Sequence, residues 1–223
     1  MTKLSVVMPV KNLLQMTEKT IKSLVENTPC LGEIILIDDH STEDMTKIKG
    51  VKYHLNPSTG VNAAWNYGGS LAEYPYIAWL NNDVLFSPNW AEPLIDALND
   101  NVWLVSPYHT SFDLPADFPA GKGRKKNLSP GQTGLPFIGS AFMMMKNWEK
   151  VRPIDERLKI YCGDNYIFET ITALGKQANE IPESYVHHFI SQTISWQTNG
   201  LPHGFQEDNT MFNLIFSEKQ WTT

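Results

Sequence analysis

Short apolar runs alternate with helical patterns along the first hundred residues, and this alternation restricts the chain to few folds. The apolar runs that we assign to strands are Leu4–Val10, Glu33–Ile37, Val51–Leu55, Tyr76–Leu80 and Trp103–Val105. The helical patterns between them are Thr17–Glu26, a helix start at Ser41–Asp44, Gly60–Leu71 and Pro88–Leu98. Strands that alternate with helices predict a mostly parallel α/β sheet with right-handed crossovers. Because the apolar runs are continuous, we expect helices on both faces of this sheet.

The pattern changes after residue 106. Residues 107–136 are rich in proline and glycine and carry the basic run Lys122–Lys126, which predicts a long irregular loop. Further along, we expect strands at Phe137–Met145 and Tyr185–Phe189 and helices at Asn165–Leu174 and Thr210–Phe216. Four tryptophans are expected in the core or in pocket walls: Trp65, Trp79, Trp90 and Trp103. The chain is therefore predicted to form a single domain over residues 1–223.

Composition and charge disfavour several classes of protein. The chain has 223 residues, 42% of them hydrophobic, and a formal net charge of -6, which disfavours nucleic-acid binding over the whole surface. Its two cysteines, Cys30 and Cys162, fit a reduced compartment better than a disulfide framework. No stretch has the length and apolar character of a signal peptide or a membrane span. We therefore expect a cytoplasmic protein, soluble or peripheral to a membrane.

Polar side chains follow three of the predicted strands where each strand ends. Pro9–Asn12 end the first strand, Asp38-Asp39 the second, and Asn81–Asp83 follow Tyr76–Leu80. Because the carboxyl ends of parallel strands meet at one edge of the sheet, we expect these groups to converge. The oxygen atoms of Asn81–Asp83 suit Mg²⁺ or Mn²⁺, although a simple polar turn explains that segment equally well when it is taken alone. The set fits a nucleotide diphosphate, while the absence of GxGxxG and Walker A sequences disfavours dinucleotide and P-loop folds.

In this order and spacing, the segments resemble those of family 2 glycosyltransferases of the GT-A fold. That fold has a Rossmann-like, mostly parallel central sheet with helices on both faces and a smaller acceptor-side sheet. The matching segments are Ser5–Asn12, Ile37–Ser41, Gly60, Asn66, Leu80–Val84, Phe137–Ala141, Ile154–Arg157 and Gly163-Asp164. Leu80–Val84 stands in place of the Asp-x-Asp motif, as in the rhamnosyltransferase-like branch. Each segment is weak evidence alone, but their order and spacing together are fairly specific.

The resemblance implies an inverting transfer of sugar from a nucleotide-diphosphate donor, most readily a UDP-sugar, to a glycan acceptor. It assigns residues 1–106 to the nucleotide-binding half and residues 137–223 to the acceptor-binding half. The implied donor-binding residues are Pro9, Val10, Asn12, Asp38, Asp39, Gly60, Asn66, Asn81 and Asn82. Asp83 and His188 would hold a divalent metal, Mn²⁺ or Mg²⁺. Asp164 would be the general base that deprotonates the acceptor hydroxyl.

The chain departs from the family pattern at two positions. Asn81 replaces the first Asp of Asp-x-Asp, and an amide is a weaker metal ligand than a carboxylate. Gly163 stands where the family has Glu, which leaves Asp164 without that neighbour. From the residues alone, Asp164 could instead cap the helix that follows it. His187-His188 could be an ordinary strand pair, of which only one member points inward.

Other functions stay open from the sequence. The basic run is a solvated loop, a flap over the donor diphosphate, or a contact for a polyanionic acceptor through Lys122, Arg124, Lys125 and Lys126. The last alternative fits a phage-type sugar transferase that acts on modified nucleic-acid bases. The changes at Asn81 and Gly163 motivate a non-catalytic nucleotide-binding module. A nucleotidyltransferase is disfavoured because Lys11–Gln15 is not a glycine-rich loop.

Overall fold

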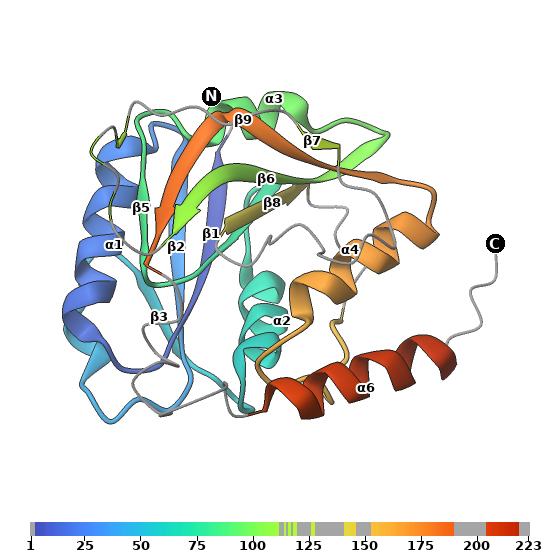
Figure 1. The fold of residues 1–223 in the computed structure, drawn as a ribbon. Helices are drawn as coiled ribbons and strands as arrows, with labels where there is room; N and C mark the ends of the chain where they lie inside the picture. Colours follow the sequence, from blue (N-terminus) through green and yellow to red (C-terminus); the bar gives the residue numbers. More distant parts are fainter. Residues whose placement is uncertain are drawn as a thin grey trace.

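The computed structural model describes residues 3–111, 114, 116, 118–119, 126–127, 141–145, 153–189 and 204–218. Its strands are β1 (Leu4–Val10), β2 (Leu31–Asp38), β3 (Lys52–Leu55), β4 (Tyr76–Leu80), β5 (Val84–Phe86), β6 (Val102–Ser111), β7 (Lys126–Asn127), β8 (Ala141–Met145) and β9 (Gln177–His188). Its helices are α1 (Leu14–Asn27), α2 (Val61–Leu71), α3 (Ala91–Ala97), α4 (Gly163–Ala173) and α6 (Phe205–Glu218), with a 3₁₀ turn η1 (Met45–Lys47). The strands form one nine-stranded sheet in the order β3-β2-β1-β4-β8-β6-β9-β5, and β7 pairs with β9 (Figure 1).

The first half of the sheet is parallel, as the alternation of strands and helices predicted. β1 lies between β2 and β4, and β2 pairs with β3. Val10 lies opposite Asp38, so β1 and β2 end at the same edge. In the second half, β8 runs antiparallel between β4 and β6, while β6 and β9 are parallel. In the described residues, β6, β8 and β9 therefore continue the central sheet.

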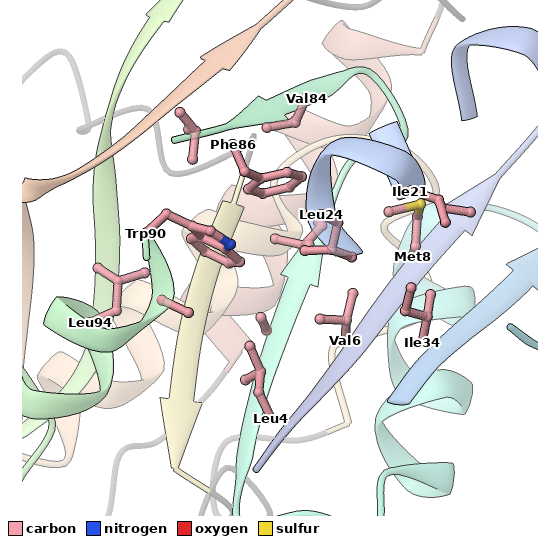
Figure 2. Packing of buried hydrophobic residues seen from close by; sticks show 14 of the residues in the cluster. Leu4, Val6, Met8, Ile21, Leu24, Ile34, Val84, Phe86, Trp90 and Leu94 are labelled. Carbon is pink, nitrogen blue, oxygen red and sulfur yellow. The ribbon is translucent and has the colours of Figure 1, made fainter. Parts of the chain in front are cut away.

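Helices cover both faces of the sheet, and alternate residues of β1 divide between two cores. Leu4 and Met8 face the α1 and α3 side, where the rings of Phe86 and Trp90 lie 4.7 Å apart (Figure 2). Val7 faces the opposite core, to which α2, α4 and α6 contribute (Figure 1). The tryptophans predicted to be in the core are buried: Trp65, Trp79, Trp90 and Trp103. This two-sided burial explains why the strand sequences are apolar throughout.

Several elements differ from the sequence predictions. The helix expected from Ser41 is only the short turn η1, capped by Asp44, because the residues before it form a polar loop against the end of β1. β6 and β9 are longer than predicted, so the first residues of the predicted irregular segment belong to β6. β5 was not predicted, because a three-residue strand carries little periodicity and its partner β9 is distant in sequence.

The closing helix predicted near the C-terminus is α6, and it packs on the core that contains α4. Ile215 is fully buried, and the Phe216 ring lies edge-on to Tyr166 at 5.6 Å. At its end, Glu218 accepts a hydrogen bond from Arg157 Nη1 at 3.0 Å. α6 therefore contacts both α4 and the segment that leads into it. Within the part of the chain that the structure describes, no helix has the length and apolar character needed to cross a bilayer.

Candidate active site

Asp39, just beyond the end of β2, anchors the loop that begins α2. Its Oδ1 accepts hydrogen bonds from the Gly60 backbone N–H at 2.9 Å and from Asn56 Nδ2 at 2.8 Å. Its Oδ2 faces Lys11 Nζ at 3.3 Å. Gly60 has φ of 95°, and a Cβ there would lie 2.4 Å from the Lys159 carbonyl oxygen. A glycine is therefore required at the point where the loop before α2 meets the segment that leads into α4.

Asp38, the last residue of β2, is buried and oriented by two donors. Its Oδ1 accepts the Ser41 backbone N–H at 2.9 Å, and its Oδ2 accepts the Tyr53 hydroxyl at 2.9 Å. Burial and the nearby Asp38 carboxylate raise the pKa of Tyr53 to about 12, so the phenol stays a donor. Each carboxylate oxygen has a further lone pair. Asp38 can therefore accept another hydrogen bond from a ligand without losing its orientation.

Asn12 organises the loop beside these two aspartates. It has φ of 60°, and its Oδ1 accepts the backbone N–H groups of Thr42 at 2.7 Å and Glu43 at 3.1 Å. Its own N–H donates to Ser41 Oγ at 2.8 Å. At the end of β1, the Val10 carbonyl accepts the Asp39 N–H at 2.8 Å. Hydrogen bonds thus connect the predicted nucleotide-binding residues at the ends of β1 and β2 along one edge of the sheet.

The segment after β4 meets β9 at a second cluster of polar groups. His188 Nε2 lies 3.1 Å from Asp83 Oδ1 and 3.3 Å from Asn81 Nδ2. β5 creates this contact, since Val84 lies opposite His188 and the Phe189 N–H donates to the Asp83 carbonyl at 3.0 Å. Asp83 and His188 are 3% and 2% exposed, so the cluster is shielded from bulk water.

This cluster contains side chains that could hold a divalent cation. Across the ranges that the structure describes, no three His, Cys, Asp or Glu side chains converge on one point. The side chains here that could hold a cation are Asp83, His188 and, through its amide oxygen, Asn81. Turning the Asn81 amide by 180° presents Oδ1 in place of Nδ2. The carboxylate and amide oxygens are ligands that suit Mn²⁺ or Mg²⁺.

The neighbouring His187 faces the other side of β9, as expected for successive strand residues. Its Nδ1 lies 2.9 Å from Thr110 Oγ1, and its ring lies edge-on to Phe189 at 4.7 Å. It is fully buried. Of these two histidines, only His188 therefore belongs to the polar cluster.

Two of the predicted donor-binding residues, Asn82 and Asn66, form hydrogen bonds that connect elements of the protein itself. Asn82 Nδ2 donates to Thr17 Oγ1 at 3.0 Å, which ties the segment after β4 to α1. Asn66 exchanges two hydrogen bonds with the Ile154 backbone, at 2.9 and 2.8 Å. Contact of either amide with a nucleotide stays a prediction.

Asp164 lies in the first turn of α4, one residue inside the helix. Helix α4 begins at Gly163, and its N-cap residue is Cys162. Asp164 is therefore not the N-cap residue, the alternative role that the sequence allowed. Its Oδ1 accepts the Asn165 N–H at 2.9 Å, and burial raises its pKa above the ordinary carboxyl value. Burial, with smaller contributions from Asp164 and Asp208, raises the pKa of Cys162 to about 11, so its thiol stays neutral. Asp164 is therefore the candidate proton acceptor in this turn.

Gly163 leaves room for Asn62 of α2. An added Cβ would lie 1.8 Å from Asn62 Oδ1 and 3.1 Å from Trp65 Cζ3. Asn62 is fully buried, and its Nδ2 donates to the carbonyls of Leu158 and Tyr161 at 3.1 and 3.2 Å. The position where the family has Glu is therefore filled from α2 in this chain.

We expect Gly163→Ala to lower the free energy of unfolding by about 1–3 kcal/mol through overpacking against Asn62. Urea denaturation measures this change. In an Asn62→Ala background, which removes Oδ1, the same substitution should cost clearly less, because the conflict with Asn62 is gone and only the 3.1 Å approach to Trp65 Cζ3 remains. Equal costs of Gly163→Ala in the two backgrounds would contradict this account.

Several residues of the site were not singled out from the sequence. Lys11 and Tyr53 bind the two aspartates, and Asn56 and Asn62 hold adjoining loops. Asp208 of α6 accepts three backbone N–H groups just before α4. Lys11 lies within a motif segment and could have been found there. The others act across long sequence separations and leave no local signal.

Part of the predicted site lies outside the described residues. This applies to Lys122, Arg124 and Lys125 of the basic run and to residues 137–140. For Lys126, the structure describes only the backbone, which pairs with Glu180 of β9. A nucleic-acid contact through this run therefore stays a prediction.

The sheet topology defines an α/β fold, and comparison with known proteins identifies the family. Residues 5–152 match the model of glycosyl transferase family 2, and the chain belongs to this family. The chain also shares its fold with a solved structure described as GalNAc-T7 with UDP, GalNAc and Mn²⁺. That match has a TM-score of 0.68 and 20% identity, and it covers 84% of this chain and 44% of the other. The α/β GT-A fold predicted from the sequence is thereby confirmed.

Curated relatives agree with the family assignment. An uncharacterized glycosyltransferase of Rickettsia conorii is 35% identical over 118 residues, which are 50% of this chain and 19% of the relative. Human polypeptide N-acetylgalactosaminyltransferase 6 is 27% identical over 213 residues, covering 76% of this chain and 34% of the relative. The chain thus spans about a fifth and a third of the lengths of these two relatives.

Proposed function

We propose that this glycosyltransferase moves a sugar from a UDP-sugar to an acceptor hydroxyl, with inversion at the anomeric carbon and with the help of a divalent cation. The contact of Asp83 and Asn81 with His188 carries the proposal, because it gathers cation ligands beside the end of β4. The GT-A neighbour described with UDP, GalNAc and Mn²⁺ supports this choice of donor and metal. The partly buried carboxyl of Asp164, whose pKa desolvation raises, adds a candidate base.

Different side chains of the site would have different roles in the reaction. Asp38 and Asp39 would orient the base and ribose through carboxylate oxygens already fixed by Tyr53, Asn56 and Gly60. Asp164 would take the proton of the acceptor hydroxyl. As it does so, the hydroxyl oxygen bonds to the anomeric carbon and the bond from that carbon to the diphosphate breaks. A bound cation would neutralise charge on the leaving diphosphate.

A glycan is the proposed acceptor, as the resemblance to family 2 suggested. Modified nucleic-acid bases are the alternative class of acceptor. Binding of such an acceptor would depend on the basic run Lys122–Lys126, most of which lies outside the described residues. Membership in the rhamnosyltransferase-like branch likewise stays a prediction, which the donor panel below addresses.

Incubation with a panel of nucleotide sugars, with Mn²⁺ and with Mn²⁺ removed by chelation, tests the proposal. We expect one UDP-sugar to be consumed at a rate that falls at least tenfold on chelation. NMR of the transferred sugar should show the anomeric configuration opposite to that of the donor. Tight, metal-insensitive nucleotide binding without turnover on any sugar or oligosaccharide acceptor would instead identify a non-catalytic nucleotide-binding module. A product with retained configuration would refute the inverting mechanism.

A further inference from the structure

Asp208 of α6 binds the backbone immediately before α4. Its Oδ1 accepts the Lys159 N–H at 3.0 Å, and its Oδ2 accepts the N–H groups of Ile160 and Tyr161, each at 2.8 Å. Asp208 is 4% exposed. Hydrogen bonds to an ionised acceptor are about twice as strong as neutral ones. A single buried carboxylate therefore fixes three consecutive peptide groups.

The other side of this segment contacts α2. Asn62 Nδ2 donates to the carbonyls of Leu158 and Tyr161. The Lys159 carbonyl lies where a side chain on Gly60 would be, and Gly60 is itself held by Asp39. Residues 158–161 are thus clamped between α2 and α6, the helices that flank the lower end of α4 in Figure 1.

We propose that Asp208 is a positioning residue for sugar transfer. Through residues 159–161 it fixes the start of α4 and thereby the place of Asp164, three residues after Tyr161. This inference rests on the proposed function, in which Asp164 is the base. A base must lie within about 3 Å of the oxygen that carries the proton, and a misplacement of about 1 Å can cost roughly 100-fold in rate. The role of Asp208 should therefore appear in the rate of transfer and not in donor affinity.

Asp208→Asn tests the proposal with little change of shape, because an amide keeps one acceptor oxygen but turns an N–H₂ group toward the backbone donors. The adjacent, exposed Glu207→Gln is the matched control, since it removes a charge from the same turn of α6. For each protein, kcat, the donor KM, the UDP dissociation constant with Mn²⁺ and amide hydrogen exchange over 158–162 are measured. Asp208→Glu, which keeps the charge on a longer stem, is the second variant in case Asp208→Asn does not fold.

We expect Asp208→Asn to lower kcat by about 10- to 100-fold, with donor KM and UDP affinity within about threefold of wild type. Exchange over 158–162 should accelerate, and Glu207→Gln should match wild type throughout. Asp208→Glu should lower kcat less, again at unchanged UDP affinity. A kcat within twofold of wild type in the folded variants would overturn the inference, as would a parallel loss of UDP affinity. If the wild-type protein transfers no sugar from any donor, it is the proposed function that fails.

Discussion

Replacement of Asp164 by asparagine should lower the rate of sugar transfer by about 10²–10⁴-fold, the usual contribution of a positioned general base. The amide has nearly the same shape and keeps an acceptor for the Asn165 N–H, but it cannot take a proton. Binding of UDP with Mn²⁺, measured by calorimetry, should be unchanged. Glu169→Gln is the matched control, because Glu169 is a partly buried acid further along α4 whose pKa burial also raises. Full transfer activity in Asp164→Asn would show that another group is the base.

The raised pKa of Asp164 sets the sign of two further effects, one on the pH dependence of the wild-type protein and one on the stability of the same variant. The base acts only when ionised, so the acidic limb of the wild-type pH–rate profile should lie above the ordinary range of aspartate. For stability, a pKa raised by folding favours the protonated form, and this contribution is lost as pH rises through the folded-state pKa. Asparagine resembles the protonated acid. Thermal unfolding at pH 7 should therefore show Asp164→Asn to be at least as stable as wild type.

Replacement of Asp83 by asparagine should abolish the dependence of UDP affinity on Mn²⁺ and lower transfer by about 100-fold or more, equivalent to ~2.7 kcal/mol of transition-state stabilisation. The variant removes the carboxylate that lies 3.1 Å from His188 Nε2. It leaves intact the Asp83 carbonyl, which accepts the Phe189 N–H. Calorimetry of UDP with and without Mn²⁺ measures the first effect, and transfer assays measure the second.

Asp96→Asn is a suitable control for this experiment, since Asp96 is an exposed carboxylate on α3 outside the polar edge. An unchanged response to Mn²⁺ in Asp83→Asn would place the cation elsewhere. Loss of UDP affinity both with and without the cation would mean that Asp83 supports the nucleotide site itself.

Much of the fold follows from local pattern in the sequence. The apolar runs of β1, β2 and β4 are long enough to be recognised as buried strands, and helices between them require parallel neighbours. The predicted convergence of strand ends is confirmed at Val10 and Asp38, which lie opposite each other. The polar loop after β2 was mistaken for a helix start, because acids near a chain turn resemble a first helical turn. Its hydrogen bonds instead go to Asn12, about thirty residues earlier in the chain.

The sequence by itself determined the kind of sheet and the residue types gathered at its edge, because strand periodicity and strand ends are local properties. Only the tertiary structure decided which distant groups meet there. Asn81 and His188 are 107 residues apart and touch because the unpredicted β5 pairs with β9. Asp208 reaches Ile160 because α6 packs its apolar face against α4. Such contacts depend on the packing of whole elements, whose free energy is shared among many side chains and leaves no mark in any short segment.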